Sequence, residues 1–406
     1  MDDTLGFRDT QGFRDTLAAD TGAGDDEPAL AGLDRRARVW AEVDLGALGR
    51  NLEVLRARLP AAVKVLAVLK ADAYGHGAVL CARRLEELGV AMVGVGDSRE
   101  ALELRRAGVR APILVLGAIV PGEMADIVRH DIATCIHSSE RASLLAEVAQ
   151  ALGRRARVHV KVDTGMGRLG VLPRVARGLA TTIARDPRLE LEGICTHYGS
   201  AASPVPFHTA EQLTSFVRLV EEVRADGIRP ALVHASNSAA VFSTLGEHFN
   251  MVRVGLALFG VNPGNLPVGA SPVEPVLSLR SQVAFLKDLP EGSPVGYNRT
   301  FATRRPTRIA VIPFGYSDGY PYALSNRAYV LVRGERAPVL GAVSMDYTTV
   351  DVTDIPGVHV GEEVTMVGTS GKRRITVEDL ARRIGTIPYE ITARLGRRVA
   401  RVPVGV

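Results

Sequence analysis

The feature that most constrains the fold is a regular alternation of aliphatic runs and amphipathic segments between residues 63 and 255. Short apolar runs bounded by turn residues are typical of buried strands. Amphipathic segments such as Ser98–Ala107 and Ser138–Leu152 predict the intervening helices. The predicted strands lie near residues 63–69, 91–95, 112–116, 132–136, 157–162, 189–196, 230–235 and 251–255.

This alternation predicts an α/β protein with an N-terminal (β/α)8 barrel of the TIM type over residues 38–261. Strands that alternate with helices form parallel sheets, and eight such units close into a barrel. An open doubly wound sheet is the alternative, but no glycine-rich dinucleotide turn follows the first unit. Before the first barrel strand, Asp44 is expected to cap a helix that ends by Pro60.

The pattern changes near Asn262 and predicts a mostly β C-terminal domain over residues 262–406. Proline and glycine cluster at 263–275, and short alternating runs follow. These runs lie at Val276–Leu286, Arg308–Ile312, Tyr329–Val332, Thr348–Val352 and Glu363–Val367, before a predicted helix at Thr376–Ile384. An early strand at residues 38–43 would be a ninth strand beside the eight that form the predicted barrel. As an alternative to the barrel, this strand joins the C-terminal domain.

Residues 1–37 are predicted to be a disordered tail. GFRDT occurs twice there, and the composition is too poor in apolar residues to form a core. A short amphipathic helix around Phe7, Phe13 and Leu17 is the alternative. The acidic start is unlike a signal peptide, and no run approaches the ~18 apolar residues of a membrane span. We therefore expect a cytoplasmic protein without a membrane partner.

Composition excludes several other classes of function. The net charge is +4, and the basic residues are spread without interleaved aromatic residues, so nucleic acid is not an expected partner. Cys81, Cys135 and Cys195 are far apart and form no CxxC pair, which favours a reducing compartment over a disulfide framework. The histidines have no metal-ligand spacing, so no metal is expected.

Lys70 is the first candidate for chemistry, because it ends the first predicted barrel strand. Active sites of such barrels lie at the C-terminal ends of the strands. A half-buried lysine loses its charge readily and can form a Schiff base. The alternative is that Lys70 turns toward solvent and has no chemical role. His76, in the turn that follows, is interpreted as a capping or packing residue.

Later strand ends supply groups that suit a phosphate. Strand seven ends in VHASNSAA (233–240) and strand eight is MVRVGLALFG (251–260). The hydroxyl of Ser238 and the backbone exposed at Gly255 are what a phosphate dianion needs. A lysine and a phosphate site in one barrel mouth predict pyridoxal 5'-phosphate, which binds through a Schiff-base lysine.

Nine blocks lie in order along the chain and are more specific together than any one alone: LKADAYGHG, KVDTGMGRLG, THY, SNSAA, MVRVGL, VGYNRTF, GYSDGY, VSMDYTTVD and IPYE. Their resemblance is to the alanine racemase family, over about residues 38–405. It implies interconversion of L-alanine and D-alanine with pyridoxal phosphate, which supplies D-alanine for peptidoglycan.

The resemblance also implies two catalytic bases. Lys70 would hold the cofactor and act on one face of the substrate. Tyr297 would act on the other face from a second subunit, so a homodimer with shared sites is implied. Because tyrosine has a pKa near ~10, Tyr297 needs help from His197, which would orient it, or from Arg168.

The remaining site residues follow from the same resemblance. Arg168 would contact the cofactor's phenolic oxygen and the substrate carboxylate, and Lys161 matches a lysine that is carbamylated in many relatives. For Lys161, a simple neighbourhood with Asp163 or Arg168 is the alternative. Tyr74, Ser238, Gly255, Leu256 and Tyr389 would hold the phosphate. Met345 would bind substrate by its backbone, and Tyr316 would line the entrance.

Arg253 would face the pyridine nitrogen, and it discriminates between the alternatives. A guanidinium has only donors, so it keeps that nitrogen unprotonated and limits electron withdrawal. A related decarboxylase places an acid there, and a non-catalytic cofactor-carrying barrel lacks the domain that holds Tyr297.

A few positions depart from the commonest family pattern. They are GSAAS after THY, Ser344 for cysteine, Phe259 for tyrosine and Asp72 for asparagine. They leave a broader-specificity racemase, for example one that accepts serine, as an alternative.

Overall fold

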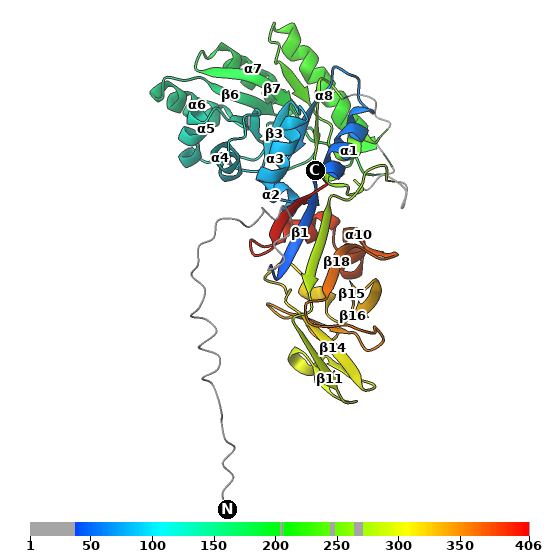
Figure 1. Ribbon diagram of the computed structural model, residues 1–406. Coiled ribbons are helices and arrows are strands. Elements are labelled where there is room, and N and C mark those ends of the chain that lie inside the picture. The colour runs from blue at the N-terminus through cyan, green and yellow to red at the C-terminus, as the bar shows by residue number, and fades with distance from the viewer. Residues whose placement is uncertain (1–36, 204, 206, 244–247, 264–270, 406) are drawn as a thin grey trace, which may run out of the picture. The chain divides into compact units, whose positions relative to one another are not determined.

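The structure is a computed structural model that describes residues 37–203, 205, 207–243, 248–263 and 271–405 (Figure 1). Except for Ala37, the predicted tail lies outside the described residues, as does its alternative helix around Phe7, Phe13 and Leu17. Among the described residues, no helix combines the length and the apolar character needed to cross a bilayer.

Eight parallel strands close into a barrel, which confirms the predicted fold class. Closure is made by β2 and β9, where Leu66 lies opposite Arg253. Each strand overlaps one of the predicted aliphatic runs. The strands are β2 (Lys64–Val68), β3 (Met92–Val95), β4 (Ile113–Val115), β5 (Ala133–Ile136), β6 (Ala156–Lys161), β7 (Leu189–Cys195), β8 (Leu232–His234) and β9 (Met251–Val254).

Helices connect these strands, and side-chain caps fix where several of them begin. Asp44, Asp97 and Ser138 each accept a hydrogen bond from a backbone amide in the first turn of the following helix. The helices are α1 (Leu45–Arg56), α2 (Lys70–Gly75), α3 (Ala78–Glu87), α4 (Ser98–Arg106), α5 (Met124–Arg129), α6 (Ser139–Ala151), α7 (Pro173–Arg185), α8 (Phe207–Ala225) and α9 (Ser238–Val241), with 3₁₀ turns η1 (Pro121–Glu123) and η2 (Leu256–Phe259).

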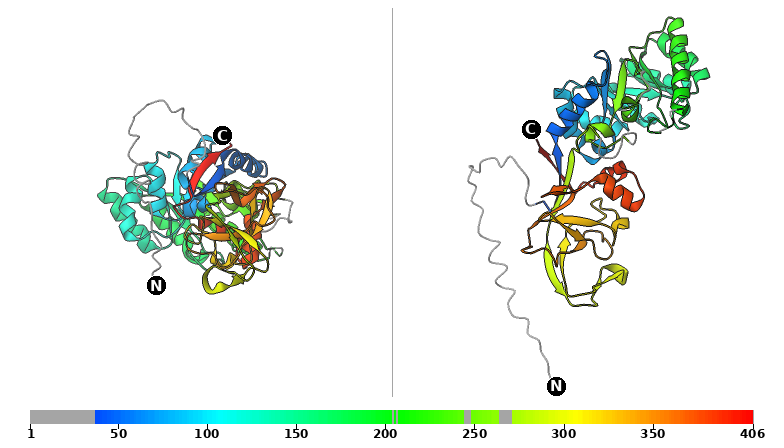
Figure 2. Two further views of the ribbon diagram at one scale, coloured as in Figure 1. Left: turned by 60° about the horizontal axis from the view of Figure 1, so that its bottom comes forward. Right: turned by 90° about the vertical axis from the view of Figure 1, so that its right-hand side faces the viewer.

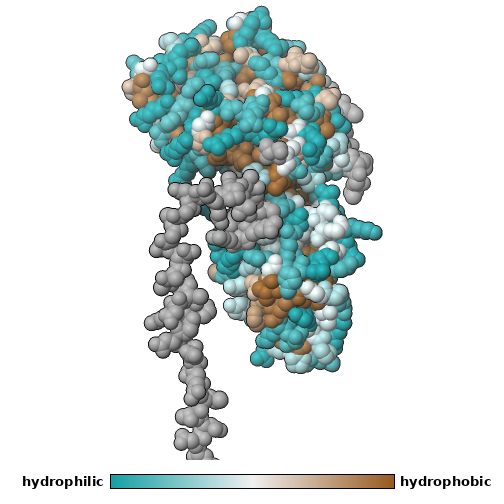
Figure 3. Space-filling view, in the orientation of Figure 1, coloured by the Kyte–Doolittle hydropathy of each residue, from teal (hydrophilic) through white to brown (hydrophobic). Residues whose placement is uncertain are grey.

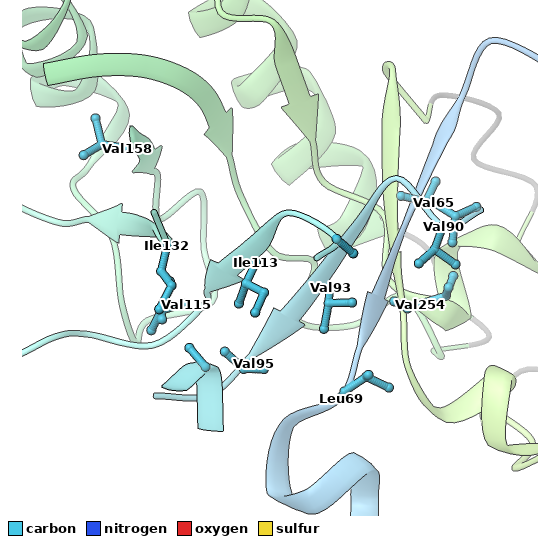
Figure 4. Close-up of a cluster of buried hydrophobic side chains, with 14 of the residues drawn as sticks. Val65, Leu69, Val90, Val93, Val95, Ile113, Val115, Ile132, Val158 and Val254 are labelled. Carbon is cyan, nitrogen blue, oxygen red and sulfur yellow. The ribbon is translucent and has the colours of Figure 1, made fainter. Parts of the chain in front are cut away.

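Alternate residues of the barrel strands enter two separate cores. Val65, Val93 and Ile113 pack outward against the helices in the cluster drawn in Figure 4. Leu66, Met92 and other apolar residues form a second cluster, which fills the barrel interior. A strand buried on both faces reads as a continuous apolar run, which is why these strands are visible in the sequence.

The C-terminal domain is built on a seven-stranded sheet with the order β16-β15-β18-β10-β1-β20, in which β19 pairs with β18. The early strand β1 (Val39–Asp44) pairs antiparallel with β10 and parallel with β20, so it lies in this sheet (Figure 2). The other strands of the sheet are β10 (Leu277–Gln282), β15 (Tyr329–Val332), β16 (Glu335–Pro338), β18 (Glu363–Ser370), β19 (Arg373–Ile375) and β20 (Ala400–Val404).

A three-stranded sheet, β11-β14-β17, and the hairpin β12-β13 complete the domain. The predicted run 276–286 is two strands, because the chain passes from one sheet to the other at Val283–Ala284. The amide of Val283 donates to the carbonyl oxygen of Glu362, and the amide of Ala284 donates to that of Val311. The remaining elements are β11 (Phe285–Leu289), β12 (Pro294–Val295), β13 (Phe301–Ala302), β14 (Thr307–Ile312), β17 (Thr348–Asp351), η3 (Tyr297–Arg299), η4 (Tyr322–Leu324), α10 (Val377–Ile384) and α11 (Pro388–Ala393).

Candidate active site

Lys70 follows β2 and opens a turn with unusual backbone geometry. Ala71, Asp72, Ala73 and Tyr74 all have φ between 53° and 54°, in the left-handed region. For residues other than glycine this conformation costs about 1–2 kcal/mol each, so surrounding contacts must hold the turn. Strain of this kind is typical of functional sites.

Glu100 supplies the main clamp on this turn. Its Oε1 accepts a hydrogen bond from the amide of Ala71 at 2.6 Å, and its Oε2 accepts from the amide of Gly96 at 2.7 Å. One carboxylate therefore ties together the chain that leaves β2 and the chain that leaves β3. Burial raises the pKa of Glu100, although the bonds from these amides oppose that effect.

The surroundings of Lys70 favour its neutral amine. Although the residue remains open to solvent, partial burial lowers its pKa. The positive charge of Arg168 lowers it further, and Glu100 acts in the opposite direction. A lysine with a lowered pKa is suited to form a Schiff base and to accept a proton.

The predicted phosphate residues lie together at the ends of β8 and β9. Ser238 is the first residue of α9, and its Oγ accepts a hydrogen bond from the amide of Gly255 at 3.0 Å. A Cβ at Gly255 would lie 2.5 Å from the Tyr74 hydroxyl, so only glycine lets these two residues meet. Leu256 follows at the start of η2.

Tyr74 and Tyr389 bring a phenol pair to the same cradle. Burial raises the pKa of Tyr74, and the nearby Tyr389 raises it further. The Tyr74 hydroxyl therefore keeps its proton and can donate a hydrogen bond. Tyr389 belongs to α11 and is partly exposed. The backbone of α11 is close to the Lys70 turn, since a Cβ at Gly75 would lie 2.0 Å from the Thr392 carbonyl oxygen.

Arg253 is buried at the end of β9 and is fully engaged with neighbours. Its Nη2 donates to the carbonyl oxygens of Thr196 at 2.7 Å and Ala235 at 2.8 Å. The same nitrogen lies 3.1 Å from Nδ1 of His197. Burial lowers the pKa of His197 well below its ordinary value, and the charge of Arg253 adds to this effect, so the imidazole is neutral.

Lys161 is buried at the end of β6. Burial lowers its pKa, and the charges of Arg253 and Arg168 lower it further. Oδ1 of Asp163 accepts hydrogen bonds from the amides of residues 165, 166 and 167 at 2.8–3.1 Å. Arg168 is close enough to influence the pKa of Lys161, as the alternative of a simple charged neighbourhood expects.

The other predicted residues lie on the C-terminal domain. Tyr297 is 72% exposed, Met345 53% and Tyr316 45%. The amide of Tyr316 bonds to the Ser344 carbonyl and that of Ser317 to the Met345 carbonyl, so the loops of Tyr316 and Met345 are side by side. Within the described residues, no hydrogen bond or ion pair joins Tyr297 to Lys70 or to His197. One chain therefore brings together the barrel residues and Tyr389, but not Tyr297.

Comparison with known families decides the relationship. Residues 43–263 match the model of the alanine racemase N-terminal domain, and residues 276–403 match that of the C-terminal domain. The chain belongs to the alanine racemase family. It is therefore an enzyme of the racemase class.

Individual relatives agree with this assignment. The chain is 42% identical to the alanine racemase of Symbiobacterium thermophilum, with 91% of this chain and 98% of that protein covered. It is 41% identical to that of Syntrophobacter fumaroxidans, with 89% and 96% covered. Among solved structures, alanine racemase of Clostridium difficile 630 aligns with a TM-score of 0.87 at 33% identity, covering 91% of this chain and 96% of that one.

A further solved relative bears on the cofactor. The alanine racemase of Bartonella henselae was solved with covalently bound pyridoxal phosphate. It aligns with a TM-score of 0.80 at 28% identity and covers 91% of this chain and all of its own.

Some residues of this racemase site are not evident in the sequence. Glu100 lies in an ordinary amphipathic helix, and only its two backbone partners reveal its role. His159 and His234 are buried in hydrogen-bond contact beneath Arg253. The one available signal was that both histidines fall inside predicted barrel strands.

Proposed function

We propose that this enzyme interconverts L-alanine and D-alanine with pyridoxal phosphate, using Lys70 and Tyr297 as bases on opposite faces of the substrate. The observation that carries the proposal is the strained turn at Lys70. It holds an amine of lowered pKa at the barrel mouth, beside the cradle of Ser238 and Gly255.

The residues present fit pyridoxal phosphate. The cradle offers the hydroxyls of Ser238 and Tyr74, and any side chain at Gly255 would fill it. Hydroxyl and amide donors suit a phosphate dianion. When bound, the cofactor supplies an electron sink that acidifies the α-hydrogen of the amino acid. Lys70 would attach it, and Tyr74, Ser238, Gly255, Leu256 and Tyr389 would hold its phosphate.

Two bases explain inversion at the α-carbon without rotation of the substrate. One base removes the α-proton from one face while the conjugate acid of the other delivers a proton to the opposite face. The lowered pKa of Lys70 increases the share of neutral amine at working pH. Met345 and Arg168 would bind the substrate carboxylate, and Tyr316 would line its entrance.

His197 is suited to assist Tyr297. Because Arg253 can only donate, Nδ1 of a neutral His197 accepts and its proton lies on Nε2. That Nε2–H can donate to the phenolic oxygen of a tyrosine and stabilise its deprotonated form.

Arg253 favours racemisation over competing reactions. Its buried guanidinium cannot give a proton to the pyridine nitrogen, so electron withdrawal from the α-carbon stays limited. Prompt reprotonation is then favoured over decarboxylation or transamination. A decarboxylase, which needs an acid at that position, is disfavoured by the same residue.

The exposed position of Tyr297 supports a homodimer with shared sites. Tyr297, Tyr316 and Met345 are proposed to meet the substrate, yet they lie exposed on the C-terminal domain. Apolar residues also gather on the face of this domain shown in Figure 3. A two-fold pairing of barrel with C-terminal domain would complete two sites at once.

Lys161 is proposed to be carbamylated. A buried amine with a lowered pKa is neutral enough to add to carbon dioxide with loss of a proton. The resulting negative charge would balance Arg168. Loss of activity in bicarbonate-depleted buffer and its recovery on addition of bicarbonate would test this modification.

The cellular role follows from the reaction. D-alanine is the form used in peptidoglycan, and a cytoplasmic location would give the enzyme access to free alanine. Broader specificity, including serine, is tested by a panel of L-amino acids, with alanine expected to have the highest kcat/KM.

Two measurements test the central proposal. Borohydride treatment of the holoenzyme should fix the cofactor on the peptide that contains Lys70, and label on another lysine would overturn the assignment. L-alanine should lose optical rotation and exchange its α-hydrogen in deuterated water. Release of carbon dioxide without inversion would instead identify a decarboxylase.

Shared sites are tested with mixed subunits. Inactive Lys70→Ala and Tyr297→Phe subunits, when refolded together, should form heterodimers with one intact site. Recovery of activity is expected, and no recovery would point to sites made within single chains.

A further inference from the structure

A line of polar side chains crosses the apolar interior of the barrel beneath Arg253. Nη1 of Arg253 lies 2.9 Å from Nδ1 of His234, and Nε2 of His234 lies 2.8 Å from Nδ1 of His159. Nε2 of His159 lies 3.1 Å from Oε2 of Glu192. Both histidines are fully buried, so these contacts replace the hydrogen bonds that their ring nitrogens would make to water.

The two ends of this line determine every proton position within it. Arg253 has only donors, so Nδ1 of His234 must accept and Nε2 of His234 must carry the proton. That proton is donated to Nδ1 of His159, which leaves the His159 proton on Nε2. Nε2–H then donates to the carboxylate of Glu192, which only accepts when ionised.

Protonation of either histidine would break the line. An imidazolium at His159 would donate from both nitrogens, which would force the proton of His234 onto Nδ1 and against the guanidinium. Burial lowers the pKa of His234 well below its ordinary value, and the charge of Arg253 lowers it further. The imidazole of His234 is therefore neutral.

Local backbone features are built around this line. β6 and β7 have a register shift between Val158 and His159, so that Leu191 and Gly193 are paired while Glu192 between them is not. Bulges of this kind redirect a side chain, and here Leu191 packs with the outer core while Glu192 reaches His159. A Cβ at Gly193 would lie 2.3 Å from Nδ1 of His159, so glycine makes room for the imidazole.

The outer end of the line is also held. Arg157 contacts Glu192 at 3.3 Å and Asp131 at 3.1 Å. Burial alone would raise the pKa of Glu192, but the hydrogen bond from His159 and the charge of Arg157 bring it below its ordinary value. The carboxylate is thus ionised.

We propose that Glu192, His159 and His234 form a directed hydrogen-bond relay that holds the guanidinium of Arg253 oriented toward the cofactor ring, with Glu192 as its remote counter-ion. The inference rests on the proposed function for the role of Arg253. Glu192, His159 and His234 are positioning residues, because they act on the reaction through Arg253.

The tautomers can be measured without any assay of activity. ¹⁵N spectra of histidine-labelled holoenzyme, assigned by loss of signals in His159→Gln and His234→Gln, should show both rings neutral with the proton on Nε2. A proton on Nδ1 of either ring, or an imidazolium, would overturn the relay even if the enzyme racemises alanine. Correct tautomers in an enzyme without racemase activity would support the relay and overturn the proposed function alone.

The influence of Glu192 on the cofactor is tested by Glu192→Gln, which keeps an acceptor but removes the charge. Glu190→Gln, on the same strand and exposed, is the matched control. We expect Glu192→Gln to shift the pH dependence of the cofactor's visible absorbance and to lower kcat on the order of tenfold with KM unchanged, as when an outer partner of a metal-bound histidine is removed. If Glu192→Gln had the same absorbance titration and the same kcat as Glu190→Gln, the role of Glu192 as counter-ion would be overturned.

Discussion

The barrel half and the C-terminal half of the candidate site differ in how completely one chain builds them. Arg253 is buried and donates to backbone carbonyl oxygens, and the half-buried Glu100 clamps the strained turn that begins at Lys70. Tyr297, by contrast, is an exposed side chain on a short turn between β12 and β13. In the proposed mechanism, the residues on the cofactor side are pre-organised within the subunit, whereas the proposed opposing base lies on a surface that the proposed partner would cover.

The largest effect should come from the barrel half. Lys70→Ala removes both the proposed cofactor attachment and one base, so we expect loss of activity by at least about 10⁴-fold together with loss of the cofactor's visible absorbance. Lys64→Ala, an exposed lysine at the start of the same strand, should retain both properties. Equal absorbance in the two variants would contradict attachment at Lys70.

Tyr297→Phe should separate the two halves. Because the barrel residues are untouched, cofactor absorbance should persist while racemisation falls about 10²- to 10⁴-fold, the range for loss of a general base. Exchange of the α-hydrogen should continue for one enantiomer and not for the other. Tyr322→Phe, another exposed tyrosine of this domain, serves as the control. Equal slowing of both exchanges would argue against a base specific to one face.

Glu100→Gln probes the clamp on the strained turn. It removes a charge that accepts two backbone amides, a loss of about 1.5–3 kcal/mol per bond to a charged group, so kcat/KM should fall roughly 10- to 100-fold. Since Glu100 raises the pKa of Lys70, its neutralisation should move the acidic limb of the pH–rate profile to lower pH. Glu103→Gln, exposed on α4, should leave the profile in place. A shift of the acidic limb to higher pH in Glu100→Gln would refute the claim that Glu100 raises the pKa of Lys70.

The smallest effect should be one of stability. Gly193→Ala places a methyl group against the ring of His159, and overpacking of this kind costs about 1–3 kcal/mol, so thermal unfolding should occur several degrees lower. Gly178→Ala, on helix α7 with open space around it, should be neutral or slightly stabilising. Equal Tm values for the two variants would mean that the barrel interior relaxes around the added methyl group.

The comparison also shows what the sequence can predict. Buried parallel strands are continuous apolar runs, so the barrel and the place of Lys70 at a strand end are visible in the chain. Nothing in Ala71–Tyr74 indicates left-handed backbone, and the carboxylate that clamps this turn lies on another helix. His159 and His234 are 75 positions apart and meet only when the barrel closes. The association of Tyr297 with Lys70 remains a prediction, since it depends on a second chain.

The position of β1 has a consequence for how this protein can be divided. β1 lies between β10 and β20, so the first strand of the described residues is completed by strands that are synthesised only after the whole barrel. A fragment that begins at residue 262 would lack a central strand of its own sheet. Deletion of the N-terminal part up to the end of the barrel would also remove β1 and disrupt the sheet of the C-terminal domain. An enzyme divided into two fragments would reassemble only if the C-terminal fragment included residues 39–44.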